Sequence, residues 1–199
     1  MNAEGLIRAV FDETRSLVAV DDALTAFASG LSIDLPLIKV SPRALPVTDR
    51  IGDLLTVASE ETRGLVAAIA AASAALCWEQ SYSKEEVGAH YLANYGWFNL
   101  ASPGGPFVSE ALRVSVGYWE AGLTYPQHAH EPEEMYVVLA GEAVVKSEGC
   151  DPVRAKPGTI IRHTPNQWHG FTMEDRPLLA MAFWKGDGLM NKSRLERVV

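Results

Sequence analysis

The chain has 199 residues, of which 48% are hydrophobic and 21% are charged, a composition typical of a globular protein. Its formal net charge of −8 has the wrong sign for binding the phosphates of a nucleic acid. The sequence contains no run of Lys and Arg that would attract the protein to an anionic membrane surface. We therefore expect neither a nucleic acid nor a membrane as a partner.

The first residues do not have the pattern of a secretory signal. They carry acidic side chains early and lack a continuous apolar segment with a cleavage site. The apolar stretch of residues 64–77 is too short to span a bilayer. The two cysteines, Cys77 and Cys150, lie far apart and form no CxxC pair, so we expect reduced thiols. A cytoplasmic location is predicted, and a monomer and a homodimer both remain open.

The first thirty residues have the pattern of two α-helices. Apolar residues recur at helical spacing from Leu6 to Val18 and are interrupted by charged ones. Asp21 or Asp22 is suited to cap a second helix, which Gly30 would end.

Prolines break the chain between residues 31 and 46. The Ala- and Leu-rich run of residues 48–80 then predicts a long helical stretch. Ser83, followed three residues later by Glu86, has the pattern of a capping box for a helix that continues to about residue 95.

At Gly96 the pattern changes to short β-branched or aromatic runs separated by Gly, Pro and Asp. Such spacing predicts an antiparallel sandwich or barrel. The clearest predicted strands are residues 112–119, 134–139, 143–147, 159–162 and 178–184. We therefore expect a mainly β fold, with an α-helical part (residues 1–96) packed on a β-barrel (residues 97–199).

Four of the five histidines lie in the predicted barrel. His128 and His130 are two residues apart, so on a strand both point to the same side. Glu134 follows a short turn and can return to that side from the next strand, with Tyr136 projecting beside it. His169, at the end of a later strand, offers a fourth ligand.

Two or three imidazoles with one carboxylate suit Zn²⁺ or Fe²⁺, with Mn²⁺, Co²⁺ and Ni²⁺ as further options. The set has too many nitrogens for Ca²⁺ or Mg²⁺. We therefore expect one divalent transition metal. The remaining histidine of this region, His163, is expected to face away from the metal and to be structural.

Residues 122–141 fit the first cupin motif, G-x5-H-x-H-x3-E-x6-G, at every defined position. Residues 158–169 resemble the second motif, G-x5-P-x-G-x2-H, but Thr164 replaces the proline and Asn166 replaces the glycine. The resemblance implies a cupin barrel, also called a double-stranded β-helix or jelly roll.

The stretch from Tyr125 to Tyr136 is similar to the signature of the cupin-type dimethylsulfoniopropionate (DMSP) lyases, in particular the DddQ type. Residues 78–82, 88–98 and 183–189 also resemble that family. The similarity extends over most of the chain from about residue 65.

That family cleaves DMSP, a small zwitterion, to dimethyl sulfide and acrylate. The resemblance implies Tyr136 as the base and places Tyr125 close to the substrate. It also implies the metal positions His128, His130, Glu134 and His169.

β-Elimination from DMSP requires removal of a proton from the carbon beside the carboxylate. A metal that binds the carboxylate stabilises the charge that develops there, and it lowers the pKa of a neighbouring phenol. The sulfonium is expected to lie against aromatic faces. The aromatic residues considered for this contact are Tyr91, Tyr95, Trp97, Tyr118, Tyr125 and Trp184.

Two other functions fit the same ligands. An Fe²⁺-dependent cupin dioxygenase has an indistinguishable metal set but does not need Tyr136 beside Glu134. A non-catalytic cupin that binds a small molecule predicts binding without turnover.

Overall fold

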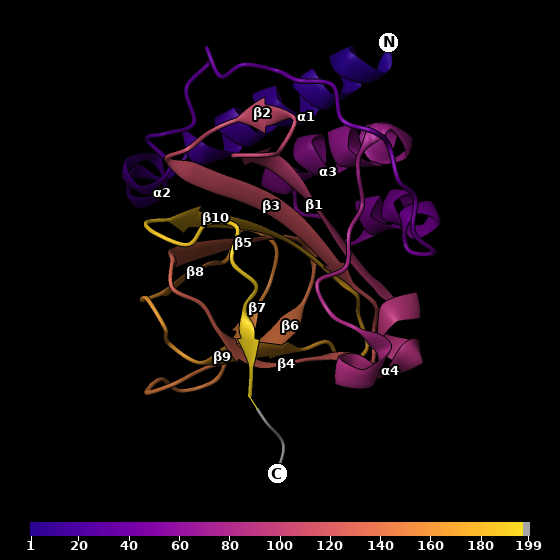
Figure 1. The fold of residues 1–199 in the computed structure, drawn as a ribbon. Helices are drawn as coiled ribbons and strands as arrows, with labels where there is room; N and C mark the ends of the chain where they lie inside the picture. The colour runs from indigo at the N-terminus through magenta and orange to yellow at the C-terminus, as the bar shows by residue number, and fades with distance from the viewer. Residues whose placement is uncertain (197–199) are drawn as a thin grey trace.

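In the computed structural model, which describes residues 1–196, a layer of helices covers one face of a two-sheet β-barrel (Figure 1). All the helices precede the barrel in the chain. They are α1 (Ala3–Val18), α2 (Asp22–Phe27), the 3-10 helix η1 (Thr48–Thr56), α3 (Glu60–Ala72), the 3-10 helix η2 (Ser73–Ala75) and α4 (Lys84–Ala93).

The predicted helix boundaries near the caps are confirmed. The Asp21 side chain accepts a hydrogen bond from the backbone N–H of Leu24 at 2.8 Å and caps α2. Ser83 and Glu86 form the predicted capping box of α4.

The prediction of one helical stretch over residues 48–80 is wrong in its middle and at its end. Residues 57–59 separate η1 from α3, and Ala58 forms a bridge with Ala140 of the barrel. The chain is extended from Leu76, and the backbone of Glu79 exchanges hydrogen bonds with Trp97 at 2.6 and 3.0 Å. This pairing with the barrel overrides the helical preference of the sequence around it.

Eleven strands form the barrel within the described residues. They are β1 (Tyr95–Ser102), β2 (Phe107–Val108), β3 (Leu112–Trp119), β4 (Thr124–Ala129), β5 (Glu133–Gly141), β6 (Ala143–Ser147), β7 (Val153–Ala155), β8 (Ile160–His163), β9 (His169–Thr172), β10 (Leu178–Lys185) and β11 (Arg194–Leu195). One sheet has the order β2-β1-β3-β10-β5-β8 and the other β11-β4-β9-β6-β7. All neighbouring strands are antiparallel except the short β1–β2 pair. The strands begin at Tyr95, two residues before the boundary predicted from the sequence.

The six-stranded sheet has a hydrophobic core on each of its faces. Outward-facing residues of its strands, such as Val116 and Phe183, pack with buried residues of α1 and α3. Inward-facing residues, such as Trp119 and Trp184, form a second core between the two sheets. Because the helices share a core with the sheet, we expect the two parts to behave as one unit.

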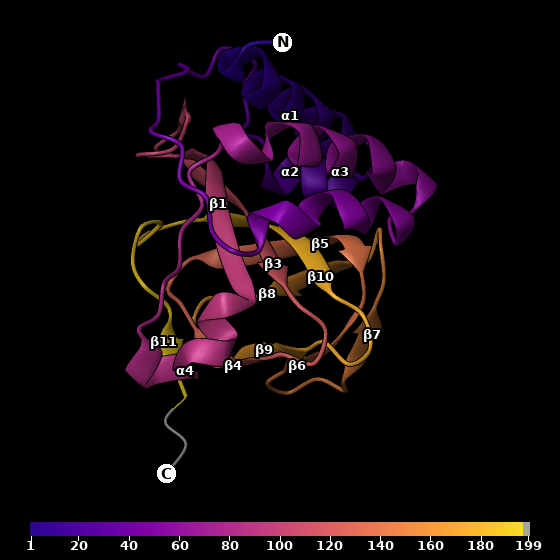
Figure 2. The same cartoon turned by 90° about the vertical axis from the view of Figure 1, so that its right-hand side faces the viewer.

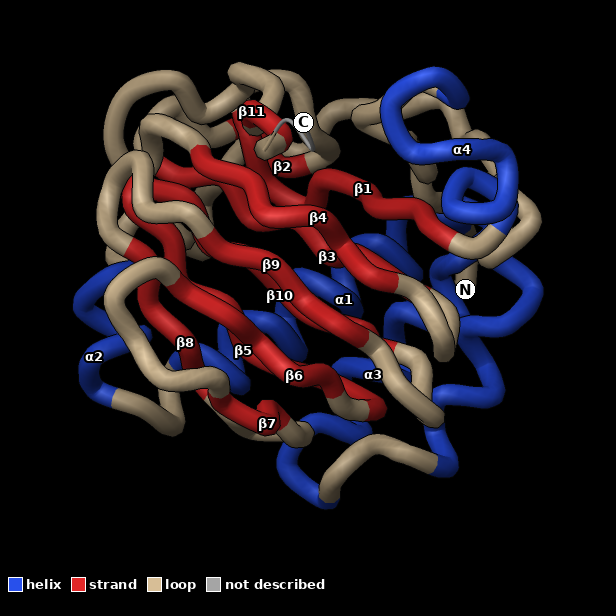
Figure 3. The backbone as a smooth tube through the Cα atoms, turned by 90° about the horizontal axis from the view of Figure 1, so that it is seen from below, coloured by secondary structure: helices blue, strands red, loops and turns tan. Residues whose placement is uncertain are grey.

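The helices differ in what they cover. Figure 2 shows α1, α2 and α3 above the six-stranded sheet, whereas α4 lies at one end of the barrel beside β4. Figure 3, seen from below, shows β4, β9 and β6 forming the opposite wall. Helix α4 therefore lies near an end of the barrel interior. Within residues 1–196, none of the helices has the length and apolar character needed to cross a bilayer.

Candidate active site

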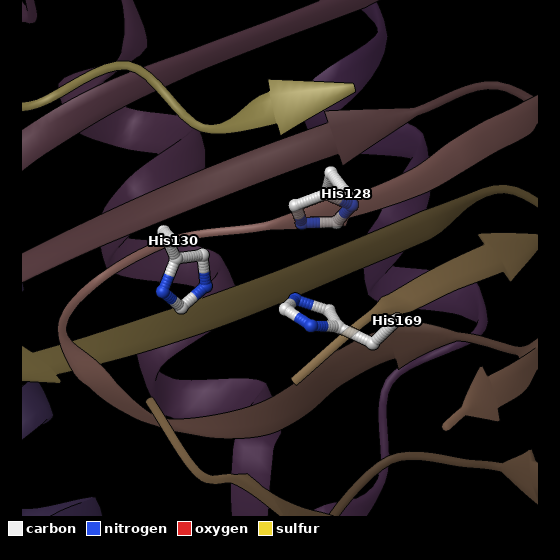
Figure 4. A group of neighbouring side chains, drawn as sticks. All are labelled: His128, His130 and His169. Carbon is white, nitrogen blue, oxygen red and sulfur yellow. The ribbon is translucent and has the colours of Figure 1, made fainter. Parts of the chain in front are cut away.

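Three imidazoles meet inside the barrel (Figure 4). His128 belongs to β4, His130 follows that strand, and His169 begins β9. Their candidate ligand atoms lie within 4.8 Å of one another, and all three residues are buried. The structure therefore brings together the three histidines that the two sequence motifs contain.

Each of these imidazoles is held by its Nδ1 atom. Nδ1 lies 3.0 Å from the carbonyl oxygen of Pro126 for His128, 2.9 Å from that of Pro132 for His130, and 2.9 Å from that of Gln167 for His169. A carbonyl oxygen can only accept, so each Nδ1 carries the proton. In a neutral imidazole, the Nε2 atom then has a free lone pair. This is the arrangement of a metal-ligating histidine.

Glu134, on β5, points its carboxylate at these lone pairs. Its Oε2 atom lies 3.2 Å from Nε2 of His130 and 3.1 Å from Nε2 of His169. Burial alone would raise the pKa of Glu134, but the imidazoles of His130, His163 and His169 hold it well below its usual range. The carboxylate is therefore ionised.

These contacts fit a cation. At 3.1–3.2 Å the Glu134 carboxylate and the two Nε2 atoms need a positive charge between them, which a proton on Nε2 or a metal ion bound by both sides can supply. Two ligands on one ion at about 2.0–2.2 Å are themselves separated by about 3.0–3.5 Å. Nε2 of His169 is buried and has no hydrogen-bond partner among residues 1–196. The donor set thus suits one divalent transition metal.

His163 does not face away, so the prediction for it is wrong. It is fully buried, and its Nδ1 lies 3.0 Å from Oε2 of Glu134. Its ring stacks on that of His169 with centroids 3.8 Å apart. In the β5–β8 register His163 pairs directly with Glu134, and paired residues share a face of the sheet.

His163 acts as a donor to the carboxylate. Burial lowers its pKa, so the imidazole is neutral. Its Nε2 lies 3.0 Å from the Ser147 hydroxyl, which can donate to it while Nδ1–H donates to Glu134. His163 therefore orients the carboxylate, and it is a site residue that the motif alone does not reveal.

The unusual second motif keeps the turn before His169. Asn166 has φ of 62° and is the only non-glycine residue with positive φ in the described part of the chain. Asparagine tolerates this left-handed conformation better than most residues, so it can replace the glycine of the motif. Its N–H donates to the carbonyl of His130 at 2.7 Å, which ties the turn to the first motif.

A cavity of ≈ 70 Å³ adjoins the cluster inside the barrel. Small side chains of β3 and β10 line it at Ser115, Gly117 and Ala182, and larger ones surround these. The surrounding residues are Tyr95, Trp97, Arg113, Trp119, Tyr125, Tyr136 and Trp184, with Ser81 and residues 191–193 also contributing. The volume corresponds to a handful of water positions and suits a ligand of a few heavy atoms.

The two predicted catalytic tyrosines line this cavity. Tyr136 is buried, and burial together with the Glu134 carboxylate raises the pKa of its phenol well above its usual range. Tyr125 stacks on the His128 ring with centroids 4.0 Å apart, and its hydroxyl lies 2.8 Å from that of Tyr82. Both phenols thus lie between the cavity and the cluster.

Comparisons with known proteins show the family of this chain. The family model of the dimethylsulfoniopropionate lyases matches residues 23–180. The chain belongs to the DMSP lyase family. It is 37% identical to dimethylsulfoniopropionate lyase DddQ of Ruegeria pomeroyi over 150 residues, which are 75% of this chain and 72% of that protein.

Solved structures of the same family have the same fold. A chain from crystal structures of the DMSP lyases RdDddP and RnDddQII has a TM-score of 0.94 and 33% identity, covering 98% of this chain and 100% of that one. The crystal structure of DMSP lyase DddQ from Ruegeria pomeroyi DSS-3 has a TM-score of 0.88 and 30% identity, covering 96% of each chain. The predicted cupin barrel with an N-terminal helical part is confirmed, and the chain is a carbon–sulfur lyase.

Within this DMSP lyase fold, the aromatic residues predicted for the substrate lie at different places. Tyr95 and Trp184 line the cavity. Tyr91 does not line the cavity but lies behind Trp119, and its hydroxyl accepts a hydrogen bond from Nε1 of Trp119 at 3.0 Å. Trp119, which was not predicted from the sequence, lines the cavity in place of Tyr91.

Tyr118 is not in the cavity, so its prediction as a substrate contact is wrong. It faces the helices on the other side of β3, and its hydroxyl donates to Glu120 at 2.8 Å. Successive residues of a strand point to opposite faces, so only one of Tyr118 and Trp119 can face the barrel interior. The strand turns Trp119 inward.

Trp184 connects the cavity to the cluster. Its Nε1 donates to Oε1 of Glu134 at 2.5 Å, and its ring lies 4.2 Å from that of His130. The two carboxylate oxygens of Glu134 are therefore held by different groups, Oε1 by the indole and Oε2 by imidazoles.

Proposed function

We propose that this chain cleaves DMSP to dimethyl sulfide and acrylate by β-elimination, with Tyr136 as the base. Family membership supports the reaction. The observation that carries the proposal is the position of the Tyr136 phenol, which lines the cavity two residues along β5 from Glu134. A dioxygenase or a passive binding protein does not need an ionisable group at this position.

We further propose that His128, His130, Glu134 and His169 hold one divalent transition metal. Zn²⁺ and Fe²⁺ are the first choices, and Mn²⁺, Co²⁺ and Ni²⁺ suit the same donors. Such an ion would bind the substrate carboxylate, stabilise the negative charge that develops on it, and lower the pKa of the adjacent phenol.

The Tyr136 phenolate then takes a proton from C2 of the substrate. The electron pair of that C–H bond forms the C2–C3 double bond, and the C3–S bond breaks with its electrons remaining on sulfur. Dimethyl sulfide leaves as a neutral molecule, so its departure needs little help from an acid. The products are acrylate, dimethyl sulfide and a protonated Tyr136.

The sulfonium lies against the aromatic wall in this proposal. Tyr95, Trp119 and Tyr125 line the cavity, and aromatic faces attract a weakly hydrated cation. The hydroxyl of Tyr125 is fixed by its contact with Tyr82 at 2.8 Å. Tyr125 therefore offers a rigid face beside the leaving group.

Incubation of the metal-loaded protein with DMSP tests the reaction. Gas chromatography should detect dimethyl sulfide, liquid chromatography should detect acrylate in equal amount, and an oxygen electrode should record no uptake. Oxygen consumption without dimethyl sulfide would instead identify a dioxygenase.

The Tyr136→Phe variant tests the base. Loss of a general base costs about 10²–10⁴-fold in rate, while metal content by elemental analysis should stay unchanged. Tyr118→Phe is the matched control, because this buried tyrosine lies on the other face of the barrel wall. A Tyr136→Phe enzyme as fast as the Tyr118→Phe enzyme would refute the assignment.

We also propose a cytoplasmic reaction, with DMSP as the only partner beside the metal. The protein would act as a monomer or a homodimer, and light scattering after size-exclusion chromatography distinguishes the two.

A further inference from the structure

Arg113 is a buried cation in the cavity wall. It lies on β3 with 9% of its surface exposed. Its Nε donates to the side-chain oxygen of Asn99 at 2.8 Å and its Nη1 to the carbonyl of Leu189 at 3.0 Å. The guanidinium lies over the ring of Trp97 at 4.8 Å and over that of Trp184 at 4.7 Å. These contacts fix the cation at one place in the wall.

The contacts of Arg113 include no counter-ion. Among residues 1–196, no carboxylate oxygen lies within 4.0 Å of its nitrogens, and both hydrogen-bond partners are neutral. Buried charges in proteins are normally paired, because an unpaired one is costly to remove from water. The second cation of the cavity, Lys192, is paired with Glu86 at 2.6 and 2.8 Å. Arg113 therefore differs from it in having no anion in direct contact among the described residues, and Glu79 acts on it only from a longer distance.

We infer that Arg113 binds the carboxylate of the ligand in the cavity and thereby determines which way round a zwitterionic substrate lies. This inference rests on the proposed function for the identity of the substrate. It adds a residue that recognises the anionic end and that belongs to neither cupin motif.

The charges around the cavity favour one orientation. Arg113 already covers a face of Trp97 and of Trp184, and its charge repels a sulfonium. Among residues 1–196, no Arg or Lys side chain lies over the rings of the remaining wall, Tyr95, Trp119 and Tyr125. A carboxylate at Arg113 with a sulfonium at that wall therefore satisfies both ends.

This orientation also brings the substrate past the base. In the sheet register Arg113, Trp184 and Glu134 form one cross-strand row. Ser115, Ala182 and Tyr136 form the next inward-facing row. A ligand that extends from the first row over the small residues of the second passes Tyr136. The carboxylate end is also the end nearer Glu134, so Arg113 and a metal ion held by the cluster would attract the same part of the substrate.

The two halves of DMSP, propionate and trimethylsulfonium, provide separate probes. Their affinities for the full-length, metal-loaded protein are measured by ligand-observed NMR titration, which needs no turnover. In Arg113→Gln, propionate should bind about 10–100-fold more weakly, as expected for the loss of a charged hydrogen-bond donor. Trimethylsulfonium should bind equally well or better, because a like charge has been removed.

A purely structural role of Arg113 predicts a different result. Loosening of the cavity would weaken both probes, and that outcome overturns the inference, as does unchanged propionate binding. Loss of propionate binding in Lys192→Met but not in Arg113→Gln would assign the anion to Lys192 and also overturn it. Arg154→Met, which removes an exposed cation paired with Glu174, controls for net charge.

A thermal melt shows whether Arg113→Gln is folded. If it is not, Arg113→Lys decides, because an ammonium keeps the charge but cannot stack between two indoles or form the same planar fork. Propionate affinity should then fall with trimethylsulfonium affinity unchanged, and equal propionate affinities would refute the inference. If the wild type does not cleave DMSP, the proposed function is wrong. The propionate titration does not depend on turnover, so it still tests whether Arg113 binds a carboxylate.

Discussion

Removal of the His163 side chain tests how Glu134, a proposed metal ligand, is positioned. In His163→Phe a planar ring remains to stack on His169, but both hydrogen bonds of the imidazole are lost. The Ser147 hydroxyl is only half-buried, so water can replace its partner. The Glu134 carboxylate is fully buried, so water cannot replace the hydrogen bond that it loses from His163. The variant therefore perturbs mainly the orientation of Glu134.

The magnitude follows from the contact that is removed. The bond from Nδ1 of His163 to Oε2 of Glu134 is 3.0 Å long, and its acceptor is charged. Hydrogen bonds to charged groups contribute about 1.5–3 kcal/mol, which corresponds to a 10- to 150-fold change in an equilibrium constant. Loss of the bonds that orient metal ligands typically weakens metal affinity by about 10–100-fold. We therefore expect metal binding to weaken by at least tenfold.

Competition with a chromophoric chelator measures the affinity. His163→Asn should recover part of it, since an amide N–H can occupy the position of Nδ1–H. His90→Gln, at an exposed helical histidine, should leave it unchanged. Equal metal affinities of His163→Phe and the wild type would show that Glu134 is held without His163, and the reasoning would be refuted.

Three further predictions concern stability and the cavity. Gly141→Ala should lower the free energy of unfolding by at least about 3 kcal/mol in denaturant titrations, because φ is 73° and the added Cβ would lie 1.6 Å from the carbonyl oxygen of Pro177. Gly158→Ala, with φ of 88° and open space around it, should cost only about 1–2 kcal/mol, and equal losses would contradict this account. Metal at 100 times its dissociation constant stabilises the fold by about 2.7 kcal/mol. A chelator should therefore lower the Tm of the metal-loaded protein by about 5–10 °C. In Glu134→Gln the chelator should lower the Tm much less. Gly117→Ala would place a Cβ 2.3 Å from the Trp119 ring, so the KM for DMSP should rise roughly tenfold, and an unchanged KM would exclude Trp119 from the substrate site.

The cluster was predictable because its members lie close together in sequence or in a fixed motif. The period of a strand predicts that His128 and His130 point to the same side, and the fixed spacing of the cupin motif adds Glu134. His163 was misplaced because its orientation depends on the register of β8 against β5, which local sequence does not contain. The pairing of residues 134 and 163 is visible only in three dimensions.

The cavity wall was predicted less well for a different reason. Strand β3 is buried on both faces, by helices outside and by the second sheet inside, so its sequence lacks a clear polar–apolar alternation. Two adjacent aromatic residues, Tyr118 and Trp119, then give no signal of which one faces the site. The same ambiguity applies to Arg113, because arginine is mostly exposed in proteins and nothing in the sequence of β3 indicates that this one is buried.

The small residues under the cavity separate two properties that an enzyme must keep. Ser115, Gly117 and Ala182 lie on β3 and β10, whereas the candidate metal ligands come from β4, β5, β9 and the turn after β4. The small side chains that limit the cavity volume and the proposed metal ligands therefore lie on different strands. Substitutions at these three positions could enlarge or fill the cavity one methyl group at a time without altering a proposed ligand, so substrate size and metal binding could change independently.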